Sequence, residues 1–329
     1  MNSQLPNDWQ LRHPRDDASA AAVRLEQLID TLSFGDFHER WDAAKEISKV
    51  GDIAIPDLIA LAQDQDLDPD GRWFAIRSLG HFDDPEVIST LISLLAQTDD
   101  DELWSAVGEA LTQIGTTAVM ALVGVLHSPP HRLVAVQALS RIHHPAALSP
   151  LLQVVNDADA TVRTMAVEAL ARAGDHEILP ILHQALNDPA STVRLAAIRG
   201  LISLKPRLDP QTLTTWLQPR LWDVHLGVAQ QTIYTLGRLD HAMATAALLS
   251  LMSTSTTPQP LQIAVVQALG WQATPTALQG LIETWAMADT EVRLAIIRAI
   301  EMLANPTLRP LARGGLLEWL EQMPKTAAT

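Results

Sequence analysis

One pattern returns along this chain with a nearly fixed period, and it constrains the fold more than any other feature. Its clearest copy is residues 156–175, NDADATVRTMAVEALARAGD. In this copy, apolar residues at offsets 0, 4, 7, 8 and 11 mark one face of an α-helix: Val162, Ala166, Ala169, Leu170 and Ala173. Gly174 is expected to end that helix, and the apolar segment 146–155 predicts another helix before it. One unit is therefore a helix, a turn and a helix.

Counted from Val162 as position 0, the apolar residue at position 8 recurs along the whole chain. It is found at Ile47, Leu79, Leu111, Leu139, Leu170, Leu201, Leu236, Leu269 and Ile300. The steps between these residues range from 28 to 35. Such a period is typical of stacked helical hairpins, each of which buries its apolar face against its neighbours. The predicted fold is all-α, an α–α superhelix of about nine hairpins.

Position 7 is small in most units, which predicts that neighbouring helices approach each other closely. The residues are Ser78, Ala110, Ala138, Ala169, Ala268 and Ala299.

The motif V-R-x-x-A-x-x-A-L resembles a known repeat. It is written VRTMAVEAL at 162–170, VRLAAIRGL at 193–201 and VRLAIIRAI at 292–300. It is similar to the HEAT-like repeat of the phycobilisome-lyase family, of the cyanobacterial type. That resemblance implies a HEAT-repeat solenoid. Its members include E/F-type phycobilin lyases, which as heterodimers attach or remove a linear tetrapyrrole on phycobiliprotein cysteines, and partners of iron–sulfur carriers.

Composition narrows the setting. The chain has 329 residues, no cysteine and a net charge of −15. Without cysteine, disulfides and thiolate chemistry are excluded. The negative charge disfavours nucleic acid as a partner, because binding to phosphates needs lysine and arginine. Residues 1–20 have no apolar core of a signal peptide, and no run approaches the length of a membrane span. We expect a cytoplasmic protein without membrane insertion.

The period also predicts the domain organisation. Residues 1–20 are polar, contain two prolines and show no period, so they are expected to form a mobile tail. Residues 21–329 are expected to form a single HEAT-like solenoid, with a closing helix at 307–323. An irregular turn is expected at 205–223, where three prolines interrupt the period and the longest step falls.

Two groups of residues suggest metal binding, and neither supports it. Residues 66–71, DLDPDG, open like a calcium loop, but Arg77 stands where that loop needs a glutamate. Four histidines lie in turns at opposite ends of one predicted helix: His127, His131, His143 and His144. They are too far apart to converge on one ion. No metal site is predicted.

Arginine recurs at position 1, and several copies follow an aspartate in the preceding turn. The pairs are Asp159 with Arg163, Asp188 with Arg194, and Asp289 with Arg293. Because a guanidinium group pairs well with a carboxylate, a structural ladder of ion pairs between successive turns is predicted. The alternative is a row that binds anions.

Tryptophan marks the best candidate for partner binding. Trp41 and Trp73 share position 2 in consecutive units, Trp104 lies one position earlier in the third, and Leu133 holds position 2 in the fourth. The acidic run Asp99, Asp100, Asp101 and Glu102 lies nearby. Two interpretations stay open, burial between repeats or an exposed ridge that binds a protein with a basic patch.

No motif indicates catalysis, since the sequence has no phosphate loop, no nucleophile elbow and no H-E-x-x-H. The leading hypothesis is a non-catalytic adaptor or assembly scaffold that uses the concave surface of the solenoid, in phycobilisome or iron–sulfur protein biogenesis. The alternative is a subunit of an E/F-type phycobilin lyase. No cofactor is predicted unless that alternative holds, in which case a linear tetrapyrrole is expected. A hetero-oligomer is left open.

Overall fold

The structure is a computed structural model, and it describes residues 14–174, 178–204, 208–285, 288–302 and 314. All regular elements in this part of the chain are α-helices or 3₁₀ helices, without a strand. The predicted all-α fold is confirmed. Contacts divide the chain into two compact units, Met1–Val154 (unit 1) and Val155–Thr329 (unit 2).

Unit 1 contains the helices α1 to α9. They are α1 (Pro14–Phe34), α2 (Phe37–Ile47), α3 (Ile55–Gln63), α4 (Pro69–Leu79), α5 (Pro85–Gln97), α6 (Asp101–Ile114), α7 (Val119–Leu126), α8 (Arg132–Arg141) and α9 (Leu148–Gln153). Short 3₁₀ helices lie between them: η1 (Asp52–Ala54), η2 (Gly115–Ala118), η3 (Pro129–His131) and η4 (Pro145–Ala147).

Unit 2 contains the helices α10 to α18. They are α10 (Ala160–Ala173), α11 (Leu179–Ala185), α12 (Ser191–Ser203), α13 (Pro210–Leu217), α14 (Leu226–Gly237), α15 (Ala242–Met252), α16 (Gln259–Gln272), α17 (Pro275–Trp285) and α18 (Thr290–Glu301), with the 3₁₀ helix η7 (Gln218–Trp222) after α13. Taken in pairs along the chain, the helices of the described residues make nine hairpins, as the period predicts.

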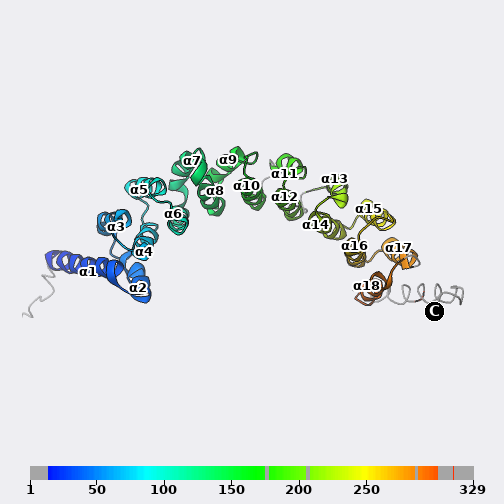
Figure 1. Cartoon of the computed structure of the whole chain (residues 1–329), viewed down its shortest axis with the longest axis horizontal. Helices are drawn as coiled ribbons and strands as arrows, with labels where there is room; N and C mark the ends of the chain where they lie inside the picture. Colours follow the sequence, from blue (N-terminus) through cyan, green and yellow to red (C-terminus); the bar gives the residue numbers. More distant parts are fainter. Residues whose placement is uncertain (1–13, 175–177, 205–207, 286–287, 303–313, 315–329) are drawn as a thin grey trace, which may run out of the picture. The chain divides into compact units, whose positions relative to one another are not determined.

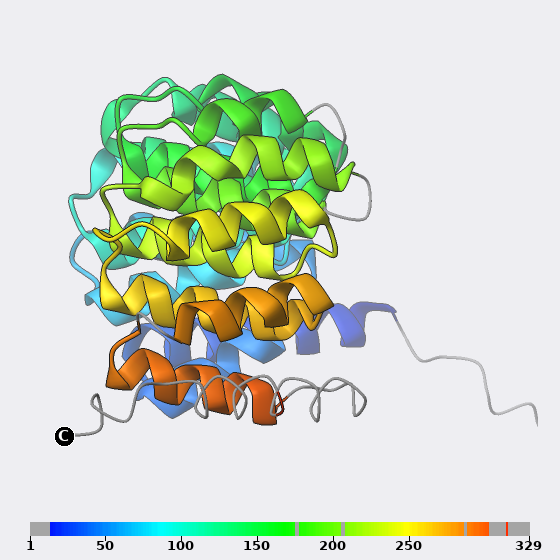
Figure 2. The same ribbon diagram turned by 90° about the vertical axis from the view of Figure 1, so that its right-hand side faces the viewer.

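Within each unit, the first helices of the hairpins lie in one layer and the second helices in another (Figure 1). In unit 1, α4 packs between α2 and α6, and α6 packs against α8. In unit 2, α10, α12, α14, α16 and α18 pack in sequence, and α15 contacts α13 and α17 in the other layer. Figure 2 shows the helices of unit 2 stacked with their axes nearly parallel.

Position 8 lies at the centre of the buried stripe of each second helix. The nine side chains at this position are at most 1% exposed. Full burial of a leucine or isoleucine side chain contributes about 1.5–3 kcal/mol relative to exposure. Within each unit the second helices pack against one another, and most of them also pack against the first helix of the same hairpin. The hairpins of a unit therefore stabilise one another.

Small residues bring neighbouring second helices close together. A Cβ atom added to Gly80 would lie 2.8 Å from Ala110 Cα, and one added to Gly237 would lie 2.6 Å from Ala268 Cβ. Gly270 faces Ala299 in the same way, at 3.1 Å. In each pair, position 9 of one hairpin meets position 7 of the next. The small residues predicted at position 7 therefore permit this close approach at three interfaces.

Aspartate begins many of the helices, because its carboxylate accepts hydrogen bonds from backbone N–H groups that have no partner in the first turn. Asp36 and Glu39 form a reciprocal capping box at α2. Asp68 accepts from Gly71 N–H at α4, and Asp84 accepts from Glu86 N–H at α5. Much of the negative charge of the chain therefore lies in the turns.

Two predicted boundaries differ from the structure. α1 begins at Pro14, so residues 14–20, predicted as tail, are helical. The segment 205–223, predicted as an irregular turn, contains α13 and η7, whose side chains Leu213, Leu217 and Leu221 are buried. Prolines stand in the first turn of both helices, where a missing N–H costs little.

Parts of these predictions lie outside the described residues. They are residues 1–13 of the tail, residues 205–207, and the closing helix 307–323 apart from position 314.

One run in the described part of the chain, Asp101–Leu126, is long and apolar enough by composition to cross a membrane, since an 18-residue window within it has a mean hydropathy of 1.4. The expectation that no run approaches a membrane span is therefore wrong as a statement about composition. The structure divides this run between α6 and α7. Gly115 stands between them with a φ of 84°, a conformation that favours glycine. The run therefore contributes to both layers of unit 1.

The close approach of second helices predicts the effect of adding one methyl group. We expect Gly237→Ala to lower the free energy of unfolding by about 1–3 kcal/mol, because its Cβ would overlap with Ala268. Gly124→Ala in α7 is the control, since no heavy atom lies within 4 Å of the added Cβ. We expect it to raise stability by about 0.5–1 kcal/mol. Urea denaturation of both variants checks this, and equal stabilities would contradict the packing.

Candidate interaction surface

The second helices expose one face that hairpin packing leaves free, and we call it the second-helix face. It is built from positions 2, 6 and 10, which lie one above another along a helix. Position 6 is polar or charged in every hairpin: Lys45, Arg77, Glu109, Gln137, Glu168, Arg199, Tyr234, Gln267 and Arg298. The sequence analysis missed this row, although its fixed spacing is visible in the repeats.

Neighbouring side chains of this row contact each other within each unit. Arg77 lies 3.9 Å from the Glu109 carboxylate in unit 1. In unit 2 the Tyr234 hydroxyl donates to Gln267 Oε1 at 3.1 Å. Polar contacts therefore join neighbouring hairpins at these two places in the row.

Four aromatic side chains of α2 and α4 form one cluster on this face, the unit 1 aromatic cluster: Phe37, Trp41, Trp73 and Phe74. The rings of Phe37 and Trp41 stack with centroids 6.2 Å apart. Phe74 is buried and meets Phe37 and Trp73 edge-on, at 5.4 and 4.9 Å. Phe37 is 57% exposed and Trp41 is 38% exposed. The cluster rests on a buried ring and presents two exposed ones.

Two cations lie over these rings. The Arg77 guanidinium carbon is 5.3 Å from the ring centroid of Trp41 and 4.7 Å from that of Trp73. Lys45 Nζ lies 5.4 Å from the Trp41 ring. A cation–π contact at an exposed site contributes about 0.5–1 kcal/mol. Arg77 therefore holds the two predicted tryptophans together, with Trp73 half-buried between hairpins and Trp41 more exposed.

Trp104 has a different role. Its indole N–H donates to the carbonyl oxygens of Thr98 at 2.9 Å and Leu95 at 3.2 Å, so it binds the end of α5. Leu133 in α8 is half-buried. No ring contact between Trp73 and Trp104 is present in the described part of the chain. The structure therefore has a pair of adjacent indoles where the sequence suggested three.

The acidic run Asp99–Glu102 spans the start of α6, with Asp101 and Glu102 in the first turn of the helix. Asp99, Asp101 and Glu102 are exposed. Asp100 caps α6, because its carboxylate accepts from the N–H groups of Glu102 and Leu103. The acidic groups therefore lie at the start of α6. Asp101 stands four residues before position 2, as Phe37 does in α2, so it lies at the beginning of the second-helix face.

The arginines at position 1 join the two helices of their own hairpin. Each donates to backbone carbonyls at or just after the end of the first helix: Arg40 to Ser33, Arg72 to Ala62, Arg132 to Leu126, Arg163 to Asp157 and Ala158, Arg194 to Asp188 and Pro189, and Arg293 to Trp285. The carbonyls bound by Arg163 and Arg194 lie in the turns before α10 and α12, and the others lie in the last turn of a helix, where a carbonyl has no partner within the helix. The guanidinium groups satisfy them.

Three of these arginines also bind an aspartate of the next hairpin. Arg163 donates to both carboxylate oxygens of Asp188 at 2.8 and 2.7 Å, and Arg194 to those of Asp223 at 2.8 and 2.6 Å. Arg40 binds Asp68 in the same way. The predicted ladder is present, but its aspartates come from the following turn rather than the preceding one.

The other predicted ladder aspartates cap helices. Asp159 accepts from Thr161 N–H at 2.7 Å. Asp289 accepts from Val292 N–H at 2.9 Å and from the Gln259 side chain at 2.8 Å. Local sequence order suggested these pairs, whereas a guanidinium group reaches the turn stacked next to it. Because the Arg163 and Arg194 side chains are buried and hydrogen-bonded, they do not form an open row for anions.

The ladder shifts the pKa of its aspartates. Burial raises the pKa of the Asp188 carboxyl, but hydrogen bonds from Arg163 and Ala190 N–H outweigh it, and the net shift is downward. The pKa of Asp223 is lowered in the same way by Arg194 and His225 N–H against its burial. For Asp68, the Arg40 hydrogen bond is the main cause of a lowered pKa. All three carboxylates therefore stabilise the folded state when ionised.

Two of the residues considered for metal binding have other partners. Asp68 of the calcium-like segment binds Arg40 and caps α4. His144 Nδ1 accepts from Ala146 N–H. In the described part of the chain, no group of three or more histidine, aspartate or glutamate side chains is arranged to hold an ion.

Comparison with protein families identifies the repeat. The chain matches the family of HEAT repeats over residues 55–140, 120–202 and 214–301, which is more than half of its length. The chain belongs to the HEAT-repeat family. A comparison with curated proteins found no match.

Solved structures of low sequence identity share the fold. Kap95p, in a structure with RanGDP, has a TM-score of 0.61 and 14% identity over 93% of this chain and 48% of Kap95p. Kap121p has a TM-score of 0.51 and 16% identity over 88% of this chain and 38% of its own. This chain therefore spans about half the length of Kap95p and less than half the length of Kap121p.

The CpcE–CpcF complex of phycocyanin lyase from Nostoc sp. PCC7120 is 19% identical over 92% of this chain and 98% of its own, with a TM-score of 0.28. A score this low carries no argument about function. The HEAT-repeat part of the predicted resemblance is confirmed, and membership in the phycobilisome-lyase family stays a prediction.

The ladder predicts a large difference between two arginine variants. We expect Arg163→Ala to lower the free energy of unfolding by about 3 kcal/mol, because it leaves the buried Asp188 carboxylate without its cation. Arg199→Ala is the control: its side chain is 61% exposed and lies 3.9 Å from Glu168, so we expect a change within about 0.5 kcal/mol. Chemical denaturation measures both. If the Arg163→Ala variant is as stable as the parent, the ladder does not stabilise the fold.

The lowered aspartate pKa values predict loss of stability in acid. A carboxyl whose pKa is depressed on folding stabilises the fold above its unfolded pKa of about 3.9, and that contribution is lost as the pH falls through the folded value. We expect this contribution to be constant from pH 7 to about pH 5 and to fall below about pH 4. Unfolding measured from pH 7 to 3 checks this. Asp188→Asn should show a smaller fall, and an identical profile would contradict the assignment.

Proposed function

We propose that this protein is a non-catalytic adaptor or assembly scaffold that binds another protein through its second-helix face. The observation that carries the proposal is the unit 1 aromatic cluster, in which Phe37 and Trp41 are 57% and 38% exposed above the buried Phe74. Tryptophan and other aromatic side chains held on a rigid base are typical of binding hot spots. HEAT-repeat solenoids in general offer long surfaces to proteins, and Kap95p, which shares the fold, binds RanGDP.

The charges around the cluster suggest how a partner would contact it. Unit 1 contains 10 lysines and arginines against 23 aspartates and glutamates. The exposed carboxylates of Asp99, Asp101 and Glu102 lie at the start of α6. The proposed partner places an apolar side chain against Phe37 and Trp41 and a basic patch against these carboxylates. Such a contact weakens as salt screens the charges.

The proposed setting is the cytoplasm, in phycobilisome or iron–sulfur protein biogenesis, and it rests on the repeat motif. The alternative function is a phycobilin lyase subunit that works as a hetero-oligomer with a linear tetrapyrrole. Since the chain has no cysteine, the thiol that carries the pigment would belong to the substrate. An absorption spectrum separates the two: a red-absorbing complex with phycobiliprotein subunits would favour the lyase, and a colourless complex with one stoichiometric protein would favour the adaptor.

Capture of partners from the native cell tests the proposed surface. We expect the Trp41→Ala variant to capture about tenfold less partner than the parent chain, because the substitution removes an exposed anchor of the cluster. Trp222→Ala is the matched control, since Trp222 is 50% exposed and lies in unit 2. It should capture the partner normally. Quantitative mass spectrometry of the eluates measures both.

Melting temperatures distinguish a lost contact from a lost fold. Trp41→Ala should melt within about 3 °C of the parent. The double variant Trp41→Ala, Trp73→Ala should melt lower, because Trp73 is half-buried and packs on Phe74. Full capture by the Trp41→Ala variant, or a collapse of its melting temperature, would exclude the cluster as the binding site.

A further inference from the structure

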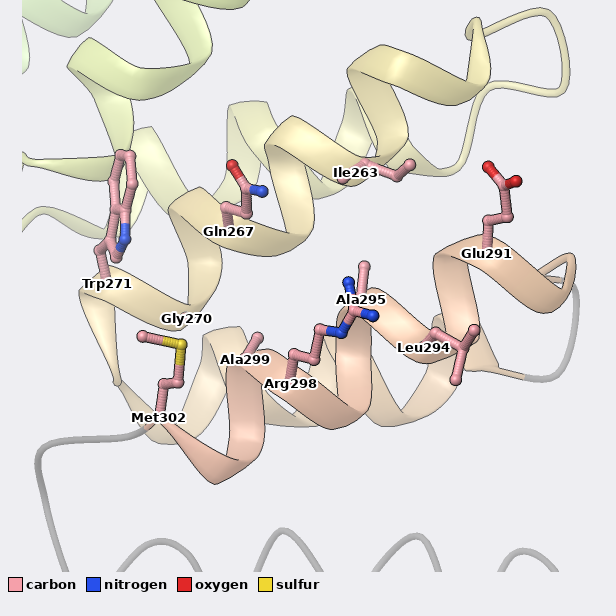
Figure 3. A pocket seen from close by; sticks show the side chains of 10 residues that line it. All are labelled: Ile263, Gln267, Gly270, Trp271, Glu291, Leu294, Ala295, Arg298, Ala299 and Met302. Carbon is pink, nitrogen blue, oxygen red and sulfur yellow. The ribbon is translucent and has the colours of Figure 1, made fainter.

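A groove lies on the second-helix face of unit 2, between α16 and α18 (Figure 3). Its volume is about 510 Å³. Ile263, Leu294 and Glu291 lie toward one end, and Trp271 and Met302 lie toward the other (Figure 3).

The groove is open because of a residue difference at position 6. One hairpin earlier, between α14 and α16, Tyr234 occupies this position, donates to Gln267 and packs 5.3 Å from the Trp271 ring. In α16 the corresponding residue is the smaller Gln267. Small residues opposite it, Ala295 and Ala299 of α18, add no bulk. The space that an aromatic ring fills in one interface is therefore free in the next.

The walls of the groove are apolar and accessible. Leu294 is 47% exposed and Trp271 is 51% exposed, and Met302 is exposed at the same end as Trp271. Ile263 continues this surface along α16. A contiguous exposed apolar surface in a concave site is typical of a binding groove.

The groove has a cation at its centre. The Arg298 side chain rises from α18 between the two ends of the groove (Figure 3). No described carboxylate forms an ion pair with it. The guanidinium carbon of Arg238 lies 5.8 Å from the Trp271 ring at one end of the groove. An arginine held over apolar walls recognises a carboxylate better than a cation or a neutral group.

The rest of the second-helix face of unit 2 also carries positive charge. Positions 2, 6 and 10 of the second helices in unit 2 carry four arginines and one glutamate: Arg172, Arg199, Arg238, Arg298 and Glu168. Four aspartates of the same unit serve elsewhere, since Asp159 and Asp289 cap helices and Asp188 and Asp223 bind the ladder. The carboxylate that lines the groove is Glu291, at the end where Ile263 and Leu294 lie, away from Trp271. The face of unit 2 is therefore cationic, although the chain is acidic.

We propose that the groove between α16 and α18 binds an acidic amphipathic helix of a partner protein. This rests on the proposed scaffold function and deepens it by adding a second docking site of stated chemistry. From Leu294 to Met302 the wall runs about 12 Å, at 1.5 Å per residue, which matches roughly two turns of a bound helix. Apolar side chains spaced three or four residues apart contact Ile263, Leu294 and Trp271, and a carboxylate between them binds Arg298.

A designed peptide of about 14 residues tests the groove, with leucines at i, i+4, i+7 and i+11 and glutamates between them, labelled with fluorescein. Its counterpart has lysine in place of each glutamate. Fluorescence anisotropy with the full chain should show binding of the acidic peptide only. We expect Arg298→Glu to weaken it about tenfold, and Leu294→Ser about fivefold. Circular dichroism confirms that both variants fold.

The control has the same charge change on the same face. Arg199→Glu alters an exposed arginine of α12, outside the groove, and should weaken binding less than about twofold, by long-range charge alone. If Arg298→Glu and Arg199→Glu weaken peptide binding equally, the groove is not the binding site, and the peptide binds only to a diffuse cationic face. No binding of the acidic peptide, or equal binding of the lysine peptide, would also overturn it. So would tighter binding of a labelled single-stranded oligonucleotide.

The proposal for the groove and the proposal for the unit 1 surface can be disproved separately. If Arg298→Glu abolishes peptide binding while the Trp41-dependent capture persists, both proposals stand on separate surfaces. If the peptide does not bind but that capture is normal, only the groove is wrong. If the peptide binds as expected and no partner depends on Trp41, the unit 1 surface is wrong and the groove remains.

Discussion

A hairpin of this chain cannot cover its own second helix, and the rest of the structure depends on that constraint. The side chain at position 8 is at most 1% exposed in all nine hairpins, because the stacked second helices cover it. Glycine at position 9 against alanine at position 7, as in Gly237 and Ala268, lets these helices come close enough. Arginine at position 1 then joins the turns, within a hairpin and to the next one. Packing therefore restricts position 8 in every hairpin and positions 1, 7 and 9 in several of them, and it leaves positions 2, 6 and 10 to vary.

The free positions account for the differences between one part of the second-helix face and another. In α2 and α4, position 2 is tryptophan and position 6 is a cation, and Arg77 joins the two indoles. In α14, α16 and α18, position 6 is Tyr234, Gln267 and Arg298 in turn. Tyr234 fills the interface between α14 and α16, whereas Gln267 leaves a groove between α16 and α18. Arg298 adds a positive charge to that groove. A repeat with one packing pattern therefore produces distinct local surfaces through the side chains at its variable positions.

The sequence predicts the periodic part of this structure and misses the part that depends on stacking. The register of position 8, the small residues at position 7 and the arginines with a structural role follow from spacing alone. The partner of Arg163 does not, because Asp159 is nearer in sequence and Asp188 is nearer in the stack. Trp104 shows the same limit, since its N–H binds the end of α5 rather than continuing a row of indoles. The prolines at 206, 210 and 219 suggested an irregular turn, yet two of them stand in the first turns of α13 and η7.

Net charge is a poor guide to the partner of such a protein, because the negative charge and the proposed binding face are built from different positions of the repeat. Aspartate is favoured in the turns as a helix cap and as a ladder partner, so acidic residues accumulate there whatever the protein binds. Over positions 2, 6 and 10, each unit carries four lysines or arginines against one glutamate. A chain with a net charge of −15 therefore presents a cationic face between acidic turns. A partner that matches this face carries acidic groups near its apolar anchors, and a basic patch matches only the edge where Asp99–Glu102 lie.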